Sequence, residues 1–177
     1  MKGHIEYRIL CGTLNIPDLH EFLNKTKALA TACGVVIQGL NSDLLAGKRH
    51  LDFAIEKALR AFAEGKNVAK DPGIEIMRYA AGERQIERSF LLGLSEGENR
   101  GAFVVLGGDI EKVEQALLGL KEFFIETSCS AQLAYTPEKR KGILEKFGIE
   151  EPELEAAGDA QIPELVLERV ALADFSK

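Results

Sequence analysis

The sequence has few of the residues from which metal and disulfide sites are built. Its 177 residues include three cysteines and three histidines. Cys11, Cys33 and Cys129 are odd in number and form no Cys-x-x-Cys pair, which is a poor disulfide framework, so we expect reduced, partly buried thiols. No histidine has a second ligand at the spacing of a metal site. We therefore expect neither a metal nor a cofactor.

The sequence also lacks a long apolar run. No stretch approaches the roughly 18–20 residues that a helix needs to cross a bilayer. Residues 1–6 lack the apolar core of a secretory signal peptide. Hydrophobic residues make up 46% and charged residues 28%, which argues against disorder over most of the chain. We expect a cytoplasmic protein with a single domain over residues 1–177.

Familiar catalytic motifs are missing as well. There is no Gly-x-Ser-x-Gly elbow, no Gly-x-Gly-x-x-Gly after a strand and no set of kinase catalytic sequences. Residues 42–49 match a phosphate loop poorly, because Ser42 replaces its first glycine and Arg49 replaces its magnesium-binding hydroxyl. We therefore predict no catalytic residue. Catalytic groups can also converge from distant segments, so an enzyme acting on a small molecule is an alternative.

Apolar patterns predict an α/β domain of the mixed α+β kind. Strands are expected at residues 5–10, 35–37 and 102–106, and a fourth within 124–133. The clearest helix covers residues 49–64. Its apolar residues fall on one continuous stripe, made of Leu51, Ala54, Ile55, Ala58, Leu59 and Phe62. This order predicts a small sheet of three or four strands flanked by many helices.

Charge is distributed unevenly along an acidic chain. The net charge is −6, yet residues 48–88 hold nine basic and seven acidic side chains. The same segment contains Gly82-Glu83-Arg84-Gln85-Ile86 between two predicted helices, at 74–81 and 84–92. A glycine there permits a sharp turn, and Arg84 and Gln85 have the donors and acceptors that suit a phosphate or an unpaired base. The alternative is a plain helix corner with solvated arginines.

The last predicted helix is apolar on every side. It begins near Pro163, and residues such as Leu165, Val166, Val170 and Leu172 point all round its axis. A terminal helix usually buries one face in its own domain. The pattern therefore indicates either a second protein bound to this helix or a helix inserted between others of the same domain.

Several segments between residues 39 and 108 together resemble a known family. They are Gly39-Leu40, HLDFAIEKALRAF at 50–62, GKNVAK at 65–70, IEIMRYAAG at 74–82 and RQI at 84–86. In combination they are similar to the kinase-binding accessory subunit of the KEOPS (EKC) complex. The most specific part is Gly-x-Arg-Gln-Ile after a helix, with the basic Gly-Lys-Asn connector upstream.

The resemblance implies a non-catalytic function. Members of this family bind the small atypical kinase/ATPase subunit of a complex that makes N6-threonylcarbamoyladenosine (t6A) in tRNA, and they bind the single-stranded 3′ CCA end of tRNA. The implied tRNA-binding residues are Lys57, Lys66, Asn67, Lys70, Gly82, Arg84, Gln85 and Ile86. The implied kinase-binding residues are Leu165, Val166, Val170 and Leu172. A scaffold that binds the kinase without contacting RNA is a further alternative.

Overall fold

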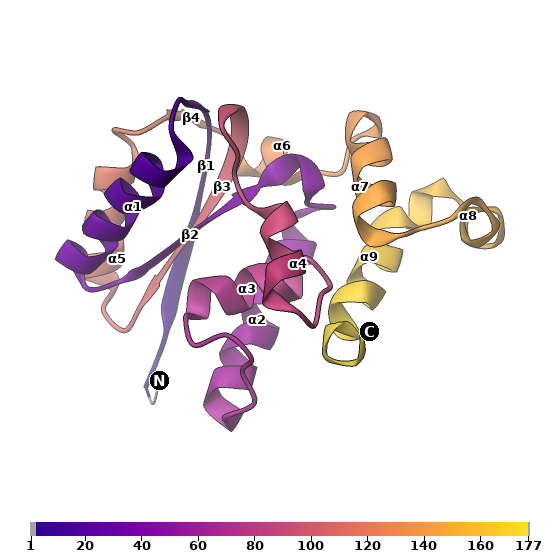
Figure 1. Cartoon of the computed structure of the whole chain (residues 1–177), viewed down its shortest axis with the longest axis horizontal. Coiled ribbons are helices and arrows are strands. Elements are labelled where there is room, and N and C mark those ends of the chain that lie inside the picture. Colours follow the sequence, from indigo (N-terminus) through magenta and orange to yellow (C-terminus); the bar gives the residue numbers. More distant parts are fainter. Residues whose placement is uncertain (1–2, 177) are drawn as a thin grey trace. The chain divides into compact units, whose positions relative to one another are not determined.

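The computed structural model describes residues 3–176 and contains two compact units, each built from two stretches of chain (Figure 1). Unit 1 comprises the described residues up to Ser42 together with Gly93–Gln132. Unit 2 comprises Asp43–Leu92 and the described residues from Leu133 onward. The predicted mixed α+β class is confirmed, since unit 1 contains a four-stranded antiparallel sheet and unit 2 is helical.

The sheet of unit 1 has the order β2-β3-β1-β4. Its strands are β1 (Glu6–Ile16), β2 (Val36–Asn41), β3 (Gly97–Gly107) and β4 (Ile125–Thr127). The strand expected at 102–106 is only the second half of β3. The first half is rich in polar side chains and pairs with β1 from Ile16 opposite Gly97 onward.

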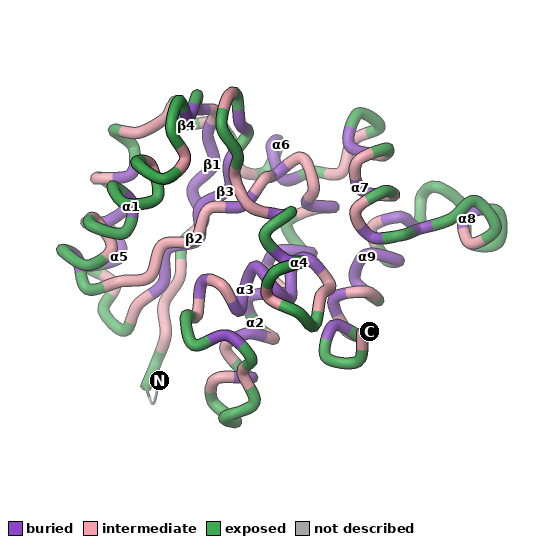
Figure 2. The backbone as a smooth tube through the Cα atoms, in the orientation of Figure 1, coloured by how far each residue is buried: buried purple, intermediate pink, exposed green. Residues whose placement is uncertain are grey.

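Two helices cover one face of this sheet, α1 (Leu19–Cys33) and α5 (Ile110–Leu120) (Figure 1). Each begins at an aspartate whose carboxylate accepts a backbone N–H of the first turn. Their apolar sides pack on Leu10, Phe103 and Val105 of the central strands to form the core of the unit, which is visible as buried segments in Figure 2. Two crossover helices on an antiparallel sheet of this order make a split β-α-β arrangement.

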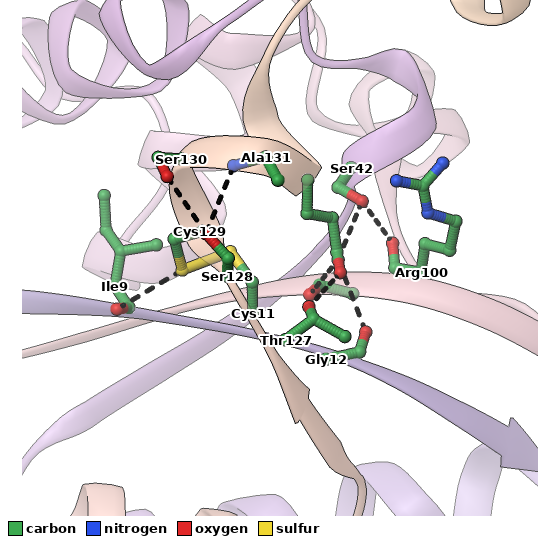
Figure 3. Close-up of a disulfide and its surroundings, with 12 residues drawn as sticks. Ile9, Cys11, Gly12, Ser42, Arg100, Thr127, Ser128, Cys129, Ser130 and Ala131 are labelled. Atoms are coloured by element: carbon green, nitrogen blue, oxygen red, sulfur yellow. Dashed lines mark hydrogen bonds between the residues drawn. A yellow bond between two sulfur atoms is a disulfide. The ribbon is translucent and has the colours of Figure 1, made fainter.

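A disulfide joins β1 to the short helix α6 (Cys129–Leu133) (Figure 3). Cys11 and Cys129 are 118 residues apart in sequence, but their Cα atoms lie 5.1 Å apart. The expectation of three reduced thiols is therefore wrong for this pair. The reason is the register of β4, which places Thr127 opposite Cys11 and so brings Cys129 close. Cys33 is a free, buried cysteine, as expected.

Buried Gln132 ties together three segments beside the disulfide. Its side-chain amide donates to the carbonyls of Gly12 and Gly101, at 3.3 and 2.8 Å, and to the hydroxyl of Ser42 at 3.0 Å. Ser42 in turn donates to the carbonyl of Arg100 at 2.8 Å (Figure 3). The amide thus satisfies backbone groups at the point where β2 ends, which fixes the exit of the chain from the sheet.

Unit 2 contains six helices within its described residues. They are α2 (Lys48–Glu64), α3 (Pro72–Ala80), α4 (Ile86–Ser89), α7 (Arg140–Phe147), α8 (Glu151–Ala157) and α9 (Ile162–Ala171). The predicted stripe of α2 is confirmed, because Leu51, Ala54, Ile55 and Ala58 are buried. A second core forms among α7, α8 and α9, and the guanidinium of Arg169 holds α8 through two 2.8 Å hydrogen bonds to Glu153.

Two helices of unit 2 are shorter than predicted. The expected helix at 84–92 is four residues of α4 followed by a 3-10 turn, Phe90–Leu92. The terminal helix ends at Ala171, and a second 3-10 turn, Ala173–Phe175, follows it.

Among residues 3–176, no helix has the length and apolar character of a membrane span, and no cluster of side chains could hold a metal ion.

Candidate nucleic-acid interface

The Gly82 turn begins where α3 ends. Gly82 has a φ of +65°, a backbone conformation that L side chains rarely adopt. Its N–H donates to the carbonyl of Tyr79 at 2.9 Å, and the N–H of Glu83 donates to the carbonyl of Arg78 at 3.1 Å. This pair of hydrogen bonds is a Schellman motif, which ends the helix and redirects the chain. A Cβ atom on Gly82 would lie 3.1 Å from Cβ of Arg169, so only glycine fits here without adjustment.

Three side chains from other segments hold the Gly82 turn in place. Arg78 donates to the carbonyl of Glu83 at 3.0 Å. Lys146, on α7, donates to the carbonyl of Ala81 at 3.1 Å and pairs with the carboxylate of Glu83 at 3.2 Å. The hydroxyl of Ser176 accepts the N–H of Arg84 at 2.8 Å. The turn is thus fixed, and the negative charge of Glu83 is already engaged.

A buried ion pair between Glu75 and Arg78 stabilises the turn. Glu75 and Arg78 are both fully buried on α3, with Nη2 of Arg78 2.8 Å from the carboxylate of Glu75. Glu75 also accepts the N–H groups of Val68 and Ala69, at 3.3 and 2.8 Å. Arg78 reaches Asp174 at 2.9 Å. One ion pair therefore joins the connector after α2, the Gly82 turn and the C-terminal 3-10 turn.

Electrostatic interactions in this cluster keep the side chains of Arg78 and Tyr79 protonated. Burial disfavours the charged form of Arg78, but hydrogen bonds to Glu75 and Asp174 outweigh that effect and raise its pKa above its ordinary value. Burial, followed by the hydrogen bond from its hydroxyl to Asp174 at 2.9 Å, raises the pKa of Tyr79 to about 12. Tyr79 therefore donates to Asp174 throughout the physiological pH range.

A pocket of about 450 Å³ opens where these three segments meet. We call it the basic pocket. Its lining contains four cations, two carboxylates and two aromatic rings, together with Ala61 and Val68; the charged and aromatic members are Lys57, Arg60, Glu64, Lys66, Tyr79, Arg84, Asp174 and Phe175. One of the two carboxylates, Asp174, is already paired with buried Arg78. The uncompensated charge of the pocket is therefore positive, which favours an anionic ligand.

Three of the four cations of the basic pocket, Lys57, Lys66 and Arg84, differ in how firmly they are held. Lys57 is half-buried, and its ammonium donates to the carbonyl of Ala171 at 2.9 Å. Lys66 pairs with Glu64 at 2.7 Å, which raises the pKa of the lysine, but both side chains are exposed and such pairs separate easily. Arg84 is exposed, and within residues 3–176 no ion pair engages its guanidinium.

A second, neighbouring pocket shares Val68 and Arg84 with the basic pocket. We call it the turn pocket. It measures about 500 Å³ and is otherwise lined by Gln85, Ile86, Glu87 and Ser176. Since Arg84 borders both pockets, its guanidinium is placed to contact a ligand that extends from one to the other.

The structure brings together most of the predicted RNA-binding residues. Lys57, Lys66 and Arg84 line the basic pocket, and Arg84, Gln85 and Ile86 line the turn pocket. The other three, Asn67, Lys70 and Gly82, line neither. The amide of Asn67 donates to the carbonyl of Ala69 at 2.9 Å and so shapes the connector, and Gly82 shapes the turn.

Other residues of the basic pocket were missed as site residues. Arg60 belongs to the basic segment 48–88, but nothing in the sequence distinguishes it from the other basic residues there. Tyr79 lies in the helix predicted at 74–81 and Phe175 in the apolar terminal segment, and no pattern in the sequence places 175 beside 84. The N-terminus of the second helix is not an anion site, because α4 has only four residues.

The terminal helix is surrounded by its own unit. Leu165, Val166 and Val170 are at most 7% exposed, so three of the four predicted kinase-binding residues lie in the core and are not accessible to a partner where they stand. Leu172 is 57% exposed. Of the two alternatives, the burial favours a helix inserted between neighbours, with a short accessible end.

A groove of about 700 Å³ runs between α2 and α9 on the accessible side. Phe53, Leu167 and Ala171 provide its apolar surface. Its charged residues have both signs, and the pair Arg49–Glu164 closes one side at 2.7 Å. The mixed charge distinguishes this groove from the basic pocket and suits a protein surface better than a polyanion.

Comparison with known proteins adds no family assignment, because no family model matches the chain and no curated protein matches it.

Proposed function

We propose that this chain is a non-catalytic, cytoplasmic subunit of the KEOPS complex. In this proposal it binds and regulates the small atypical kinase/ATPase subunit and recruits tRNA by its 3′ CCA end, in support of t6A modification. The observation that carries the RNA part is the basic pocket beside the Gly82 turn, where Lys57, Lys66 and Arg84 meet.

The dimensions and charge of the pocket favour a single-stranded end. Its volume of about 450 Å³ is in the range of small-ligand sites, and it is too small for a duplex. Arg84 is exposed and its backbone N–H is held by Ser176, so its planar guanidinium can bind a phosphate without rearrangement of the turn. A flexible RNA end with its phosphates on the cations fits this arrangement.

The test compares intact tRNA with tRNA that lacks its CCA end, at one fixed salt concentration. We expect the wild type to prefer the intact tRNA and Arg84→Glu to lose that preference. Lys141→Glu is the matched control, because Lys141 is an exposed lysine of α7 that lines neither pocket and carries the same charge change. If Arg84→Glu and Lys141→Glu bind both tRNAs as the wild type does, the RNA site is not the basic pocket.

Salt dependence supplies a second readout of the same site. Each phosphate contact on a single strand contributes about 0.7 to the slope of log K against log salt. Loss of one contact in Arg84→Gln should therefore make the slope shallower by about that amount. An unchanged slope with weaker binding would mean that Arg84 acts through the fold and not through a phosphate.

The kinase part of the proposal is placed on the accessible end of α9 and the α2–α9 groove. Leu172 is the predicted contact that is exposed, and Phe53 provides apolar surface nearby in the groove. Leu172→Asp should abolish capture of the purified kinase subunit. Leu118→Asp is the control, because Leu118 is 68% exposed on α5 of unit 1. If Leu172→Asp captures the kinase subunit as well as Leu118→Asp and the wild type do, Leu172 is not part of the interface.

The enzyme alternative finds little support in the basic pocket. Tyr79 is the pocket residue with the clearest pKa shift, to about 12, and its hydroxyl is engaged by Asp174. A tyrosine that keeps its proton at neutral pH is not a general base. The pocket is therefore better suited to holding an anion than to proton abstraction.

A further inference from the structure

Phe175 is an exposed aromatic residue on a firmly held backbone. The residue is 79% exposed, although phenylalanine is among the residues most often buried. The residues on either side are both anchored. Asp174 accepts from Arg78 and from the hydroxyl of Tyr79, each at 2.9 Å, and Ser176 accepts the N–H of Arg84 at 2.8 Å. The backbone that carries the ring is thus held in place.

The ring lies at the wall of the basic pocket, beside its cations. A nucleotide has two recognisable parts, a charged phosphate and a flat base. Lysine and arginine bind the first, and an exposed aromatic ring stacks on the second. Both kinds of group converge on one pocket of about 450 Å³, which suits a ligand of nucleotide size.

We propose that Phe175 stacks on an unpaired base at the end of the RNA, so that the basic pocket receives a terminal nucleotide and not the sugar–phosphate backbone alone. This inference rests on the proposed RNA-binding function. It adds that the pocket distinguishes an RNA end with its base from one without it.

A different use of Phe175, as a contact for a protein partner, is less well supported by its position. Leu172, in the same segment, is also exposed but lines neither the basic pocket nor the turn pocket. Phe175 lines the basic pocket and neighbours four cations there. Aromatic residues interleaved with cations are typical of single-strand binding surfaces.

The experiment compares the binding of two RNAs to four proteins at fixed salt. One RNA is a labelled single strand ending in CCA, and the other has the same sequence with the base of the last nucleotide removed. The proteins are the wild type, Phe175→Ala and Phe175→Trp. Phe90→Ala is the control, because Phe90 is a 53% exposed phenylalanine of unit 2 that lines neither pocket.

We expect Phe175→Ala to weaken binding of the complete RNA by about 5-fold to 150-fold, the range found when a stacking side chain is removed. Binding of the RNA without its last base should be unaffected. Phe175→Trp should keep the preference for the base, and Phe90→Ala should behave as the wild type. Far-UV circular dichroism should be the same for all four proteins, because both rings are on the surface.

Each contrary result has its own meaning. If Phe175→Ala binds both RNAs as the wild type does while Arg84→Glu binds weakly, stacking is refuted and the proposed RNA site stands. Equal weakening on both RNAs also refutes stacking, because the ring then acts without the base. Loss of kinase capture with unchanged RNA binding assigns Phe175 to the partner. If the wild type binds neither RNA, the proposed function and this inference fall together.

Discussion

The stability of unit 2 should depend on pH through a single buried histidine. His50 is 1% exposed in α2, and its two ring nitrogens are both engaged. Nδ1 accepts the N–H of Ala46 at 3.0 Å, so Nε2 carries the proton and donates to the carbonyl of Ala80 at 2.7 Å. Burial is the main reason that the pKa of His50 falls from 6.5 to about 4, and the nearby charges of Lys139 and Lys146 lower it further.

The direction in which stability changes with pH follows from which state, folded or unfolded, binds the proton at the higher pH. The unfolded chain takes up a proton on His50 near pH 6.5, but the folded chain does so only near pH 4. The stabilisation is therefore complete above pH 6.5 and is lost as pH falls from 6.5 to 4. A shift of this size corresponds to about 3 kcal/mol in total, of which about 2 kcal/mol disappears between pH 7 and pH 5.

The assay is urea unfolding followed by far-UV circular dichroism, because the sequence contains no tryptophan. The free energy of unfolding is compared at pH 7 and pH 5 for the wild type and His50→Gln, whose side chain does not titrate. The wild type should lose about 2 kcal/mol more than the variant, since carboxylates titrate in both. Parallel pH profiles would refute the argument. So would an NMR titration giving a folded pKa near 6 for His50.

Three further predictions concern the fold. Arg78→Met should cost about 3–5 kcal/mol in urea unfolding, because it leaves a buried carboxylate without its partner; a cost below about 1 kcal/mol would show that the ion pair is not needed. Gly82→Ala should cost more than Gly65→Ala, since both have positive φ but only Gly82 has an atom within 4 Å of the added methyl group; equal costs would exclude that contact. Cys11→Ser should lower the melting temperature and cost up to about 5 kcal/mol of unfolding free energy in the chain-entropy account, and Cys129→Ser should have the same effect; a reducing agent that leaves the wild type unchanged would contradict the disulfide.

The sequence predicted those parts of the fold that depend on local pattern. The stripe of α2 was visible because its apolar residues repeat at helical spacing. The first half of β3 was not, because Glu98, Asn99 and Arg100 are polar and lack the apolar pattern of a strand, and they become a strand only by pairing with β1. The disulfide was missed for the same kind of reason, since register across the sheet and not spacing along the chain brings its cysteines together.

The candidate site was predicted in part, and the limit is again long-range contact. Lys66 and Arg84 could be predicted, because they lie in a basic connector and in a glycine turn that are recognisable from the local sequence. Phe175 lies in the apolar terminal segment, and its place in the basic pocket depends on hydrogen bonds that Asp174 and Ser176 accept from α3 and the Gly82 turn. The apolar terminal helix was likewise ambiguous until its neighbours were known.

The composition of the basic pocket has a consequence for the time at which it forms during translation. Its cations lie at Lys57 to Arg84, but its wall at Asp174 and Phe175 follows about 90 residues later. At a typical rate of about 5–20 residues per second, a ribosome needs roughly 5–20 seconds to add them. During that interval Arg78 lacks the carboxylate of Asp174 and Arg84 lacks the hydroxyl of Ser176. A nascent chain therefore displays the positive charges before it has the walls that shape them into a pocket.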